Sequence, residues 1–165
     1  MGEAESDFSA FAESGMGAET DAYIAENATV RHALTVAEGV SVAEPVILEV
    51  TLDAAHPTAL TSLSVDAKAG SSLTIVQVLR GDAEHGAAAS LTRIRAGENA
   101  QVRLVQIQLL GDNARRWNAA AVEEGRNARV EQVRIELGGI LSACGTRAAL
   151  SAAKSEYDLD AVYFG

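Results

Sequence analysis

Two stretches of this chain repeat one another at a fixed distance. Residues 96–109 read "AGENAQVRLVQIQL" and residues 124–137 read "EGRNARVEQVRIEL". Gly97 and Gly125 are equivalent, and 125 − 97 gives a period of 28 residues. That period is too long for a hairpin repeat and lies in the range of stacked structural units. The chain is therefore predicted to wind, with one unit resting on the next.

The two copies also place apolar residues at the same positions. Counted from the glycine, these are positions +3, +5, +8, +10 and +12: Ala100, Val102, Val105, Ile107 and Leu109, then Ala128, Val130, Val133, Ile135 and Leu137. The alternation has a period of two, which predicts strands. Its phase slips by one residue between +5 and +8, which predicts a bend or bulge. We expect the equivalent residues to form ladders inside the molecule.

Further copies extend the pattern. "AGSSLTIVQVL" places Gly70 at 27 residues before Gly97, and "AENATVRHALTV" at residues 25–36 echoes the same motif. Between the copies, "NAAAV" at residues 118–122 and "TRAAL" at residues 146–150 lie 28 apart and supply a second strand per turn. The sequence predicts an all-β fold, a parallel β-helix of about 27–28 residues per coil. An antiparallel β-sandwich is the alternative, but it requires no constant offset.

The first residues differ in character from the rest. Residues 1–22 are small, polar and acidic, and they cannot bury enough apolar area to repay ordering. We expect a flexible acidic tail over residues 1–22 and a β-helix domain over residues 23–165. Phe8 and Phe11 are also spaced as one face of a short amphipathic helix.

Composition limits the partners and the location. The 165 residues are 48% hydrophobic but 4% aromatic, so the core is expected to consist of small aliphatic side chains. A net charge of −10 disfavours nucleic acid and anionic membranes as partners. The start of the chain lacks a secretory signal, a lone cysteine forms no internal disulfide, and no apolar run approaches the roughly 20 residues of a membrane span. A cytoplasmic protein is expected.

Residues 126–165, "RNARVEQVRIELGGILSACGTRAALSAAKSEYDLDAVYFG", carry a family resemblance. A charged and apolar strand leads to the pair Gly138 and Gly139, then to Ser142 in a turn, a strand with Leu150, and "AVY". This order resembles the SufB/SufD family of iron-sulfur cluster assembly proteins, and the SufD branch more closely. The resemblance covers residues 44–165. It implies a right-handed parallel β-helix.

Two features depart from that family. Ala143 and Cys144 stand where members usually carry an arginine after the serine. The chain also ends at "DAVYFG", where typical members continue to a helical segment that contacts the ATPase SufC, so the chain is truncated by comparison. Residues implicated in cluster formation lie largely in that further part. No residue here inherits their roles by resemblance.

The resemblance implies a non-enzymatic scaffold that works with a SufC-type ATPase and a SufB-type sister scaffold, and that holds iron or an iron-sulfur cluster transiently. A second hypothesis is a structural β-helix that self-associates without cluster chemistry. The apolar ending "AVYFG" favours a homodimer or other homo-oligomer, because exposed sheet edges pair. A third hypothesis is a carbohydrate-active β-helix enzyme, which would use calcium on an acidic face.

Cys144 is the foremost candidate for a metal site. In an iron-sulfur context its thiolate would accept sulfur or ligate iron, although a lone cysteine between Ala143 and Gly145 is more commonly a small buried residue. His32, His56 and His85 are isolated from one another and are expected on the surface or in turns.

Three other groups carry weaker signals. "GDAEHG" at residues 81–86 offers Asp82, Glu84 and His85 as metal ligands but is predicted to be a loop. The acidic groups Glu123 with Glu124, and Glu156 with Asp158 and Asp160, are typical of solvated strand faces. The segment Arg115, Arg116 and Trp117 is typical of a partner contact or of a covered coil end. The sequence holds no GxSxG, phosphate-binding loop or HExxH motif. No catalytic residue is expected.

Overall fold

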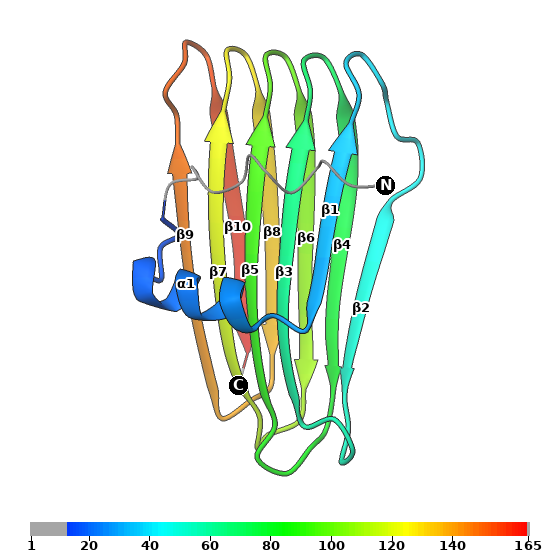
Figure 1. Cartoon of the computed structure of the whole chain (residues 1–165), viewed down its shortest axis with the longest axis vertical. Coiled ribbons are helices and arrows are strands. Elements are labelled where there is room, and N and C mark those ends of the chain that lie inside the picture. The colour runs from blue at the N-terminus through cyan, green and yellow to red at the C-terminus, as the bar shows by residue number, and fades with distance from the viewer. Residues whose placement is uncertain (1–12, 165) are drawn as a thin grey trace.

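The computed structural model describes residues 13–164, which form one short helix and ten strands (Figure 1). The elements are α1 (Ala18–Asn27), β1 (Val30–Val36), β2 (Val46–Leu52), β3 (Thr58–Ala67), β4 (Ser72–Gly81), β5 (Ala87–Ala96), β6 (Gln101–Leu110), β7 (Arg115–Glu124), β8 (Arg129–Leu137), β9 (Leu141–Ala149) and β10 (Glu156–Phe164). No helix among these residues is long and apolar enough to cross a membrane.

The strands alternate between two sheets. Sheet A has the order β1-β3-β5-β7-β9 and sheet B the order β10-β8-β6-β4-β2. All neighbouring strands are parallel. Each coil therefore contributes one strand to each sheet, and Figure 1 shows the two sheets stacked face to face. The prediction of a parallel β-helix with two strands per turn is confirmed, and the antiparallel sandwich is wrong.

The spacing between coils is confirmed at the centre and changes elsewhere. Val102 pairs with Val130, at the predicted offset of 28. Ser72 pairs with Gln101, however, so Gly70 is equivalent to Asn99 and not to Gly97. The predicted offset of 27 at that coil was wrong because the two sequences were matched by their glycines.

The turn conformation explains that mismatch. Gly70, Asn99 and Asn127 have φ of 65, 57 and 55°. Glycine and asparagine are the residues that adopt this left-handed region most readily, so either serves at this corner. The Asn127 Nδ2 donates to Asn99 Oδ1 at 3.0 Å. These residues therefore form a column along one edge of the coil.

Two other predicted alignments also fail. Asn118 pairs with Cys144, so β7 and β9 are offset by 26 residues, and the predicted alignment of "NAAAV" with "TRAAL" at 28 is wrong by two. The turn after β8 is tighter than the turn after β6, because Gly138 and Gly139 both adopt positive φ, 80 and 84°. "AENATVRHALTV" is no copy of β6, because its first residues form the end of α1 and the rest forms β1 in sheet A.

Strand β6 runs unbroken, without the predicted bend. Its buried residues alternate through Val102, Leu104, Gln106, Gln108 and Leu110. The apolar residues predicted to lie inside after the slip point outward instead, and Leu109 is 44% exposed. The cause is that two glutamines occupy interior positions. The side chains of β6 alternate between inside and outside along the whole strand. In its second half, the inward side chains are polar and the outward ones are apolar.

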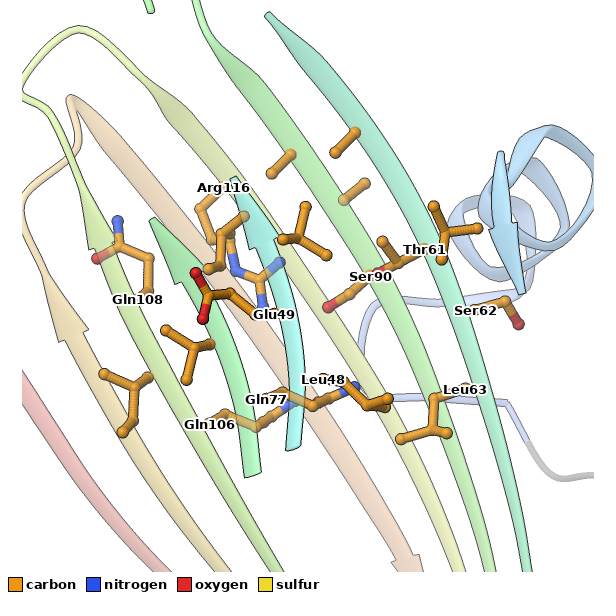
Figure 2. A pocket seen from close by; sticks show the side chains of 18 of the residues that line it. Leu48, Glu49, Thr61, Ser62, Leu63, Gln77, Ser90, Gln106, Gln108 and Arg116 are labelled. Carbon is orange, nitrogen blue, oxygen red and sulfur yellow. The ribbon is translucent and has the colours of Figure 1, made fainter. Parts of the chain in front are cut away.

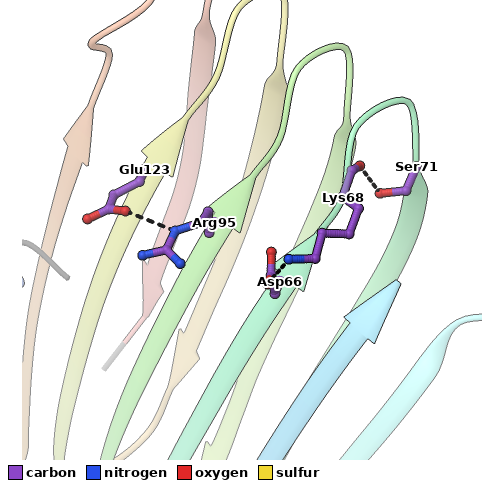
Figure 3. A network of polar contacts seen from close by, with 5 residues as sticks. All are labelled: Asp66, Lys68, Ser71, Arg95 and Glu123. Atoms are coloured by element: carbon purple, nitrogen blue, oxygen red, sulfur yellow. Dashed lines mark hydrogen bonds and ion pairs between the residues drawn. The ribbon is translucent and has the colours of Figure 1, made fainter. Parts of the chain in front are cut away.

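The first half of each sheet B strand and the facing part of sheet A form the main apolar core, and a second apolar cluster with Leu52, Leu79 and Leu110 lies at the ends of the sheet B strands. Leu63, Val65, Ile75, Ile94 and Leu104 are at most 2% exposed and pack with valines and alanines of neighbouring coils. This small aliphatic core agrees with the composition. Ion pairs lie on the outer face of sheet A. One of them joins Arg95 Nε on β5 to Glu123 Oε2 on β7 at 3.3 Å (Figure 3).

Helix α1 covers part of the outer face of sheet A. Its Ile24 packs against Leu91 and Ala119. The preceding segment approaches β9 so closely that a Cβ added at Gly15 or Gly145 would overlap the backbone of the other segment. The expected division between residues 22 and 23 falls inside this helix. Phe8 and Phe11 lie outside the described residues.

Candidate site inside the β-helix

A network of amide side chains crosses the interior between the two sheets. Gln106 Nε2 donates to Gln77 Oε1 at 2.8 Å and to Asn118 Oδ1 at 3.2 Å. Gln106 Oε1 accepts from Asn118 Nδ2 at 3.1 Å and from Gln132 Nε2 at 2.7 Å. Ser90 Oγ donates to Asn118 Oδ1 at 3.0 Å. The network therefore ties three neighbouring coils together from within.

Charged side chains continue this network toward the last coil. Glu136 from β8 accepts from Ser142 Oγ at 3.0 Å and from the Cys144 thiol at 3.5 Å, both on β9. Arg134 Nη2 donates to Thr146 Oγ1 at 2.6 Å. The structure thus places Cys144 inside the coil, beside a carboxylate and near two guanidinium groups.

The surroundings of Cys144 keep its thiol neutral. Burial is the largest cause of its raised pKa, and the charge of Glu136 raises it further. A hydrogen bond from Ser142 and the charges of Arg134 and Arg116 act in the opposite direction without outweighing burial. Since the thiolate is the nucleophile and the metal ligand, Cys144 must lose a proton before it reacts.

Glu124 is a second interior carboxyl group. It is 3% exposed, and both carboxylate oxygens are buried without a hydrogen-bond partner. Burial raises its pKa to about 7, and the charges of Asp158 and Glu156 add to the rise. The nearby backbone amide of Glu156 opposes the rise without forming a hydrogen bond of good geometry. Glu124 therefore titrates near neutral pH.

A cavity of about 50 Å³ lies between the sheets (Figure 2). Its lining runs from His32 and Leu48 in the first coil to Arg116 and Glu136 further along. His32 is exposed and Leu48 is partly exposed, whereas Arg116 is buried. The cavity thus connects a solvent-exposed region of the first coil with the charged interior.

The histidines stay apart, as predicted. His32 is exposed on β1; His56 lies in a turn, with Nδ1 3.2 Å from Asp53 Oδ1; His85 lies in the loop after β4 beside Glu84. Among residues 13–164, no three His, Cys, Asp or Glu side chains are grouped so that they could hold a metal ion.

The acidic strand is exposed, whereas the Arg-Arg-Trp segment is divided between the interior and an outer groove. Glu156, Asp158 and Asp160 are exposed on β10, and Asp158 pairs with Arg129 at 2.9 Å. Arg116 points into the interior. Its neighbour Trp117 lines an outer groove of about 480 Å³ beside α1, together with Tyr23, Ile24 and Leu60.

Sequence reasoning missed most of this interior. No role is predicted from the sequence for Gln106, Asn118, Arg134 or Glu136, and Arg116 is predicted to lie at a partner contact or at a covered coil end. Strict alternation is the available signal, because each of these residues is two, four or six positions from a buried apolar residue on its own strand. A period of two extended through the polar residues would have assigned them to the interior.

Comparison with protein families gives a match over most of these coils. The SUF system FeS cluster assembly, SufBD core domain, matches residues 50–165. The chain belongs to the SufBD family. The match spans the last four of the five coils and agrees with the resemblance noted over residues 44–165. A comparison with curated proteins gave no match, and neither did a comparison with solved structures. Membership supports involvement of this SufBD chain in iron-sulfur cluster assembly.

Proposed function

We propose that this SufBD chain is a non-enzymatic scaffold component of iron-sulfur cluster assembly in the cytoplasm, working with a SufC-type ATPase and a SufB-type sister scaffold. The family match over residues 50–165 carries the proposal. The parallel stack supports it physically, because hydrogen-bonded coils hold interior side chains at a fixed spacing of about 4.8 Å per strand. Such an interior suits a scaffold.

Cys144 is the proposed contact with sulfur or iron. Soft thiolate ligands are the usual protein ligands of iron-sulfur clusters. The Cys144 Sγ lies 3.5 Å from Glu136 Oε1, so this carboxylate is positioned to take the thiol proton. Arg116 and Arg134 favour the thiolate that would remain. Loading of sulfur or iron is therefore expected to rise with pH, as the thiol becomes easier to ionise.

Anaerobic reconstitution with iron and sulfide tests this role. Bound iron and visible absorbance are measured for the parent, for Cys144→Ser, and for Cys144→Ser combined with Ala143→Cys. The double variant keeps one thiol but moves it to the neighbouring position of β9, which faces outward by alternation. Iron in the parent and in neither variant supports the interior site. Equal iron in all three contradicts it.

The partner assignment has its own test. We expect the chain to co-purify with a SufC-type ATPase or a SufB-type scaffold when these are expressed together. Stoichiometric recovery on size-exclusion chromatography supports the assembly. Separate elution of the three proteins at micromolar concentration, in the presence and absence of nucleotide, contradicts it.

A self-associating module is the second candidate, favoured by the outer face of sheet B. Ile47, Leu109, Val162 and Phe164 are 65, 44, 57 and 77% exposed on alternate strands. Apolar patches of this kind commonly mark interaction sites. Sedimentation velocity over a range of concentration distinguishes the candidates. Self-association that Leu109→Lys abolishes, in a protein that binds no iron and no ATPase, favours the structural module.

A further inference from the structure

The outer face of sheet B is divided into a polar half and an apolar half. In the first half, the outward side chains of β4, β6, β8 and β10 are polar or charged, and Arg129 pairs with Asp158 at 2.9 Å. In the second half, three rows of side chains cross the five strands in register. All but four of the side chains in these rows are apolar, and we call this half the apolar face: Ile47, Val76, Val78, Val105, Ile107, Leu109, Val133, Ile135, Leu137, Val162 and Phe164.

No described element covers the apolar face. Ile47 is 65% exposed and Phe164 is 77% exposed. The one helix of residues 13–164, α1, lies on the other sheet, where its Ile24 packs against Leu91 and Ala119 (Figure 1). The chain thus covers apolar outer positions of sheet A and leaves those of sheet B open. Contiguous exposed apolar patches of several hundred Å² commonly mark interaction sites.

The apolar face is large enough for a reversible dimer. Five strands about 4.8 Å apart and three rows of alternate residues make a flat area of about 24 by 17 Å, which is about 400 Å² per copy. The row of Thr74, Arg103, Glu131 and Asp158 borders this area. With that row included, two copies in contact bury about 1,100 Å², which reaches the lower limit of specific protein–protein interfaces.

The distribution of charge on this face fits a second copy of the chain. The central strands β6 and β8 are aliphatic in all three rows, whereas Glu49, Arg80 and Asp160 lie toward the two edges. Glu49 and Arg80 form an ion pair with one another. The net charge of −10 therefore comes almost entirely from other surfaces. An apolar centre with a polar rim is typical of protein–protein interfaces, and its partner needs apolar side chains and no opposite charge.

We propose that two copies of this chain dimerise through the apolar face of sheet B, packed face to face as the two sheets of a β-sandwich are. Twofold dimers use the same patch on both copies. A twofold axis through the centre of the face, along or across the strands, sets β6 of one copy against β6 of the other. The two Ile107 side chains then meet near the axis. This dimer goes beyond the proposed function, because a scaffold that loads iron and a module that loads none would both form it.

Analytical ultracentrifugation over a range of protein and salt concentrations is the first test. We expect a reversible equilibrium between monomer and dimer that strengthens as sodium chloride is raised. The reason is that salt screens the repulsion between two copies that each carry a net charge of −10, and leaves the apolar contact intact. A monomer at hundreds of micromolar in high salt would overturn the proposal, and so would a dimer that high salt dissociates.

Ile107→Thr tests the face with a substitution that keeps a β-branched side chain. The dimer contains the substitution twice, so the dissociation constant should rise about tenfold or more as buried apolar area is lost. Ile135→Thr, one strand away, should have the same effect. Ile140→Thr is the matched control, because Ile140 is 63% exposed outside this face, and it should leave the dissociation constant unchanged. Folded Ile107→Thr and Ile135→Thr proteins that dimerise like the parent would rule out the face.

A single thiol locates the twofold axis. Cys144 is the one cysteine of the chain, so Ile107→Cys in a Cys144→Ser background carries its only thiol at the centre of the face. A short bismaleimide should link two such copies under conditions in which Ala33→Cys, exposed on β1 of sheet A, gives no link in the same background. Pairing of two copies through the edge of β10 would keep the thiols at position 107 several strands apart. A dimer that this reagent does not link would therefore contradict the proposal and favour edge pairing.

Iron binding measured on the same samples keeps this proposal separate from the proposed function. A dimer that binds no iron supports the face and contradicts the cluster role. A protein that binds iron and stays monomeric supports the cluster role and contradicts the face.

Discussion

The amide network predicts a large loss of stability when Gln106 is replaced by leucine. Gln106 takes part in four hydrogen bonds, two as donor and two as acceptor. Leucine is similar in size, so the cavity contribution is small. The substitution leaves the Asn118 and Gln132 amide groups as buried donors without an acceptor. At about 1–3 kcal/mol for each, the free energy of unfolding should fall by about 2–6 kcal/mol.

Urea unfolding followed by far-UV circular dichroism and by Trp117 fluorescence measures this loss. A decrease of that size is a large share of the roughly 5–15 kcal/mol typical of a domain. Gln101→Leu is the matched control, because Gln101 is exposed on the same strand, and its effect should stay within about 0.5 kcal/mol. A loss below about 1 kcal/mol for Gln106→Leu would refute the assignment of the network as a stabilising element.

Three further predictions concern single positions. The pKa of Glu124 is about 7 in the folded chain against an ordinary value of 4.5, so the free energy of unfolding should fall as pH rises from 4.5 through 7. Glu124→Gln should remove that fall, which urea midpoints measured across this pH range will show. Asn127→Ala should lower stability by about 1 kcal/mol, because its φ is positive and its bond to Asn99 is lost, whereas Asn127→Gly should cost less in the same assay. Gly145→Ala should displace the segment before α1 and red-shift the emission of Trp117, the one tryptophan of the chain, without lowering the unfolding midpoint of the coils by a comparable amount.

The repeat was sufficient to predict the fold but not every register. The offset between Val102 and Val130 was correct because both coils use asparagine at the left-handed corner. Gly70 fills the equivalent corner in the preceding coil, and an alignment by glycines therefore slipped by two residues. The identity of a corner residue is set by its φ, and two residue types meet that requirement. Residue types alone do not show which corner residues are equivalent.

The interior site was harder to predict because polarity was taken as a sign of exposure. Cys144 was identified from its chemistry, but Glu136 and Arg134 lie on another strand and reach it only through the coil. Their proximity depends on the offset of 26 between β7 and β9 and on the tight turn at Gly138. A wrong register in that turn moves every facing side chain by two positions. Contacts between sheets could not be read from a repeat within one sheet.

In the second half of β6, polar side chains face inward and apolar side chains face outward. This arrangement explains why the interior side chains were harder to predict than the fold. In β6, Val102 and Leu104 face inward, followed by Gln106 and Gln108 in the interior, while Leu109 faces outward. Exposing leucine gives up the stabilisation of burial, and the buried amides are stable because the neighbouring coils satisfy their hydrogen bonds. Local rules broken without a gain in stability are found mainly at functional positions. The same half of the sheet carries the interior charges on one side and the apolar outer face on the other. We therefore expect substitutions on the outer face of that half, such as Leu109→Lys, to separate function from folding, unlike substitutions of the interior side chains.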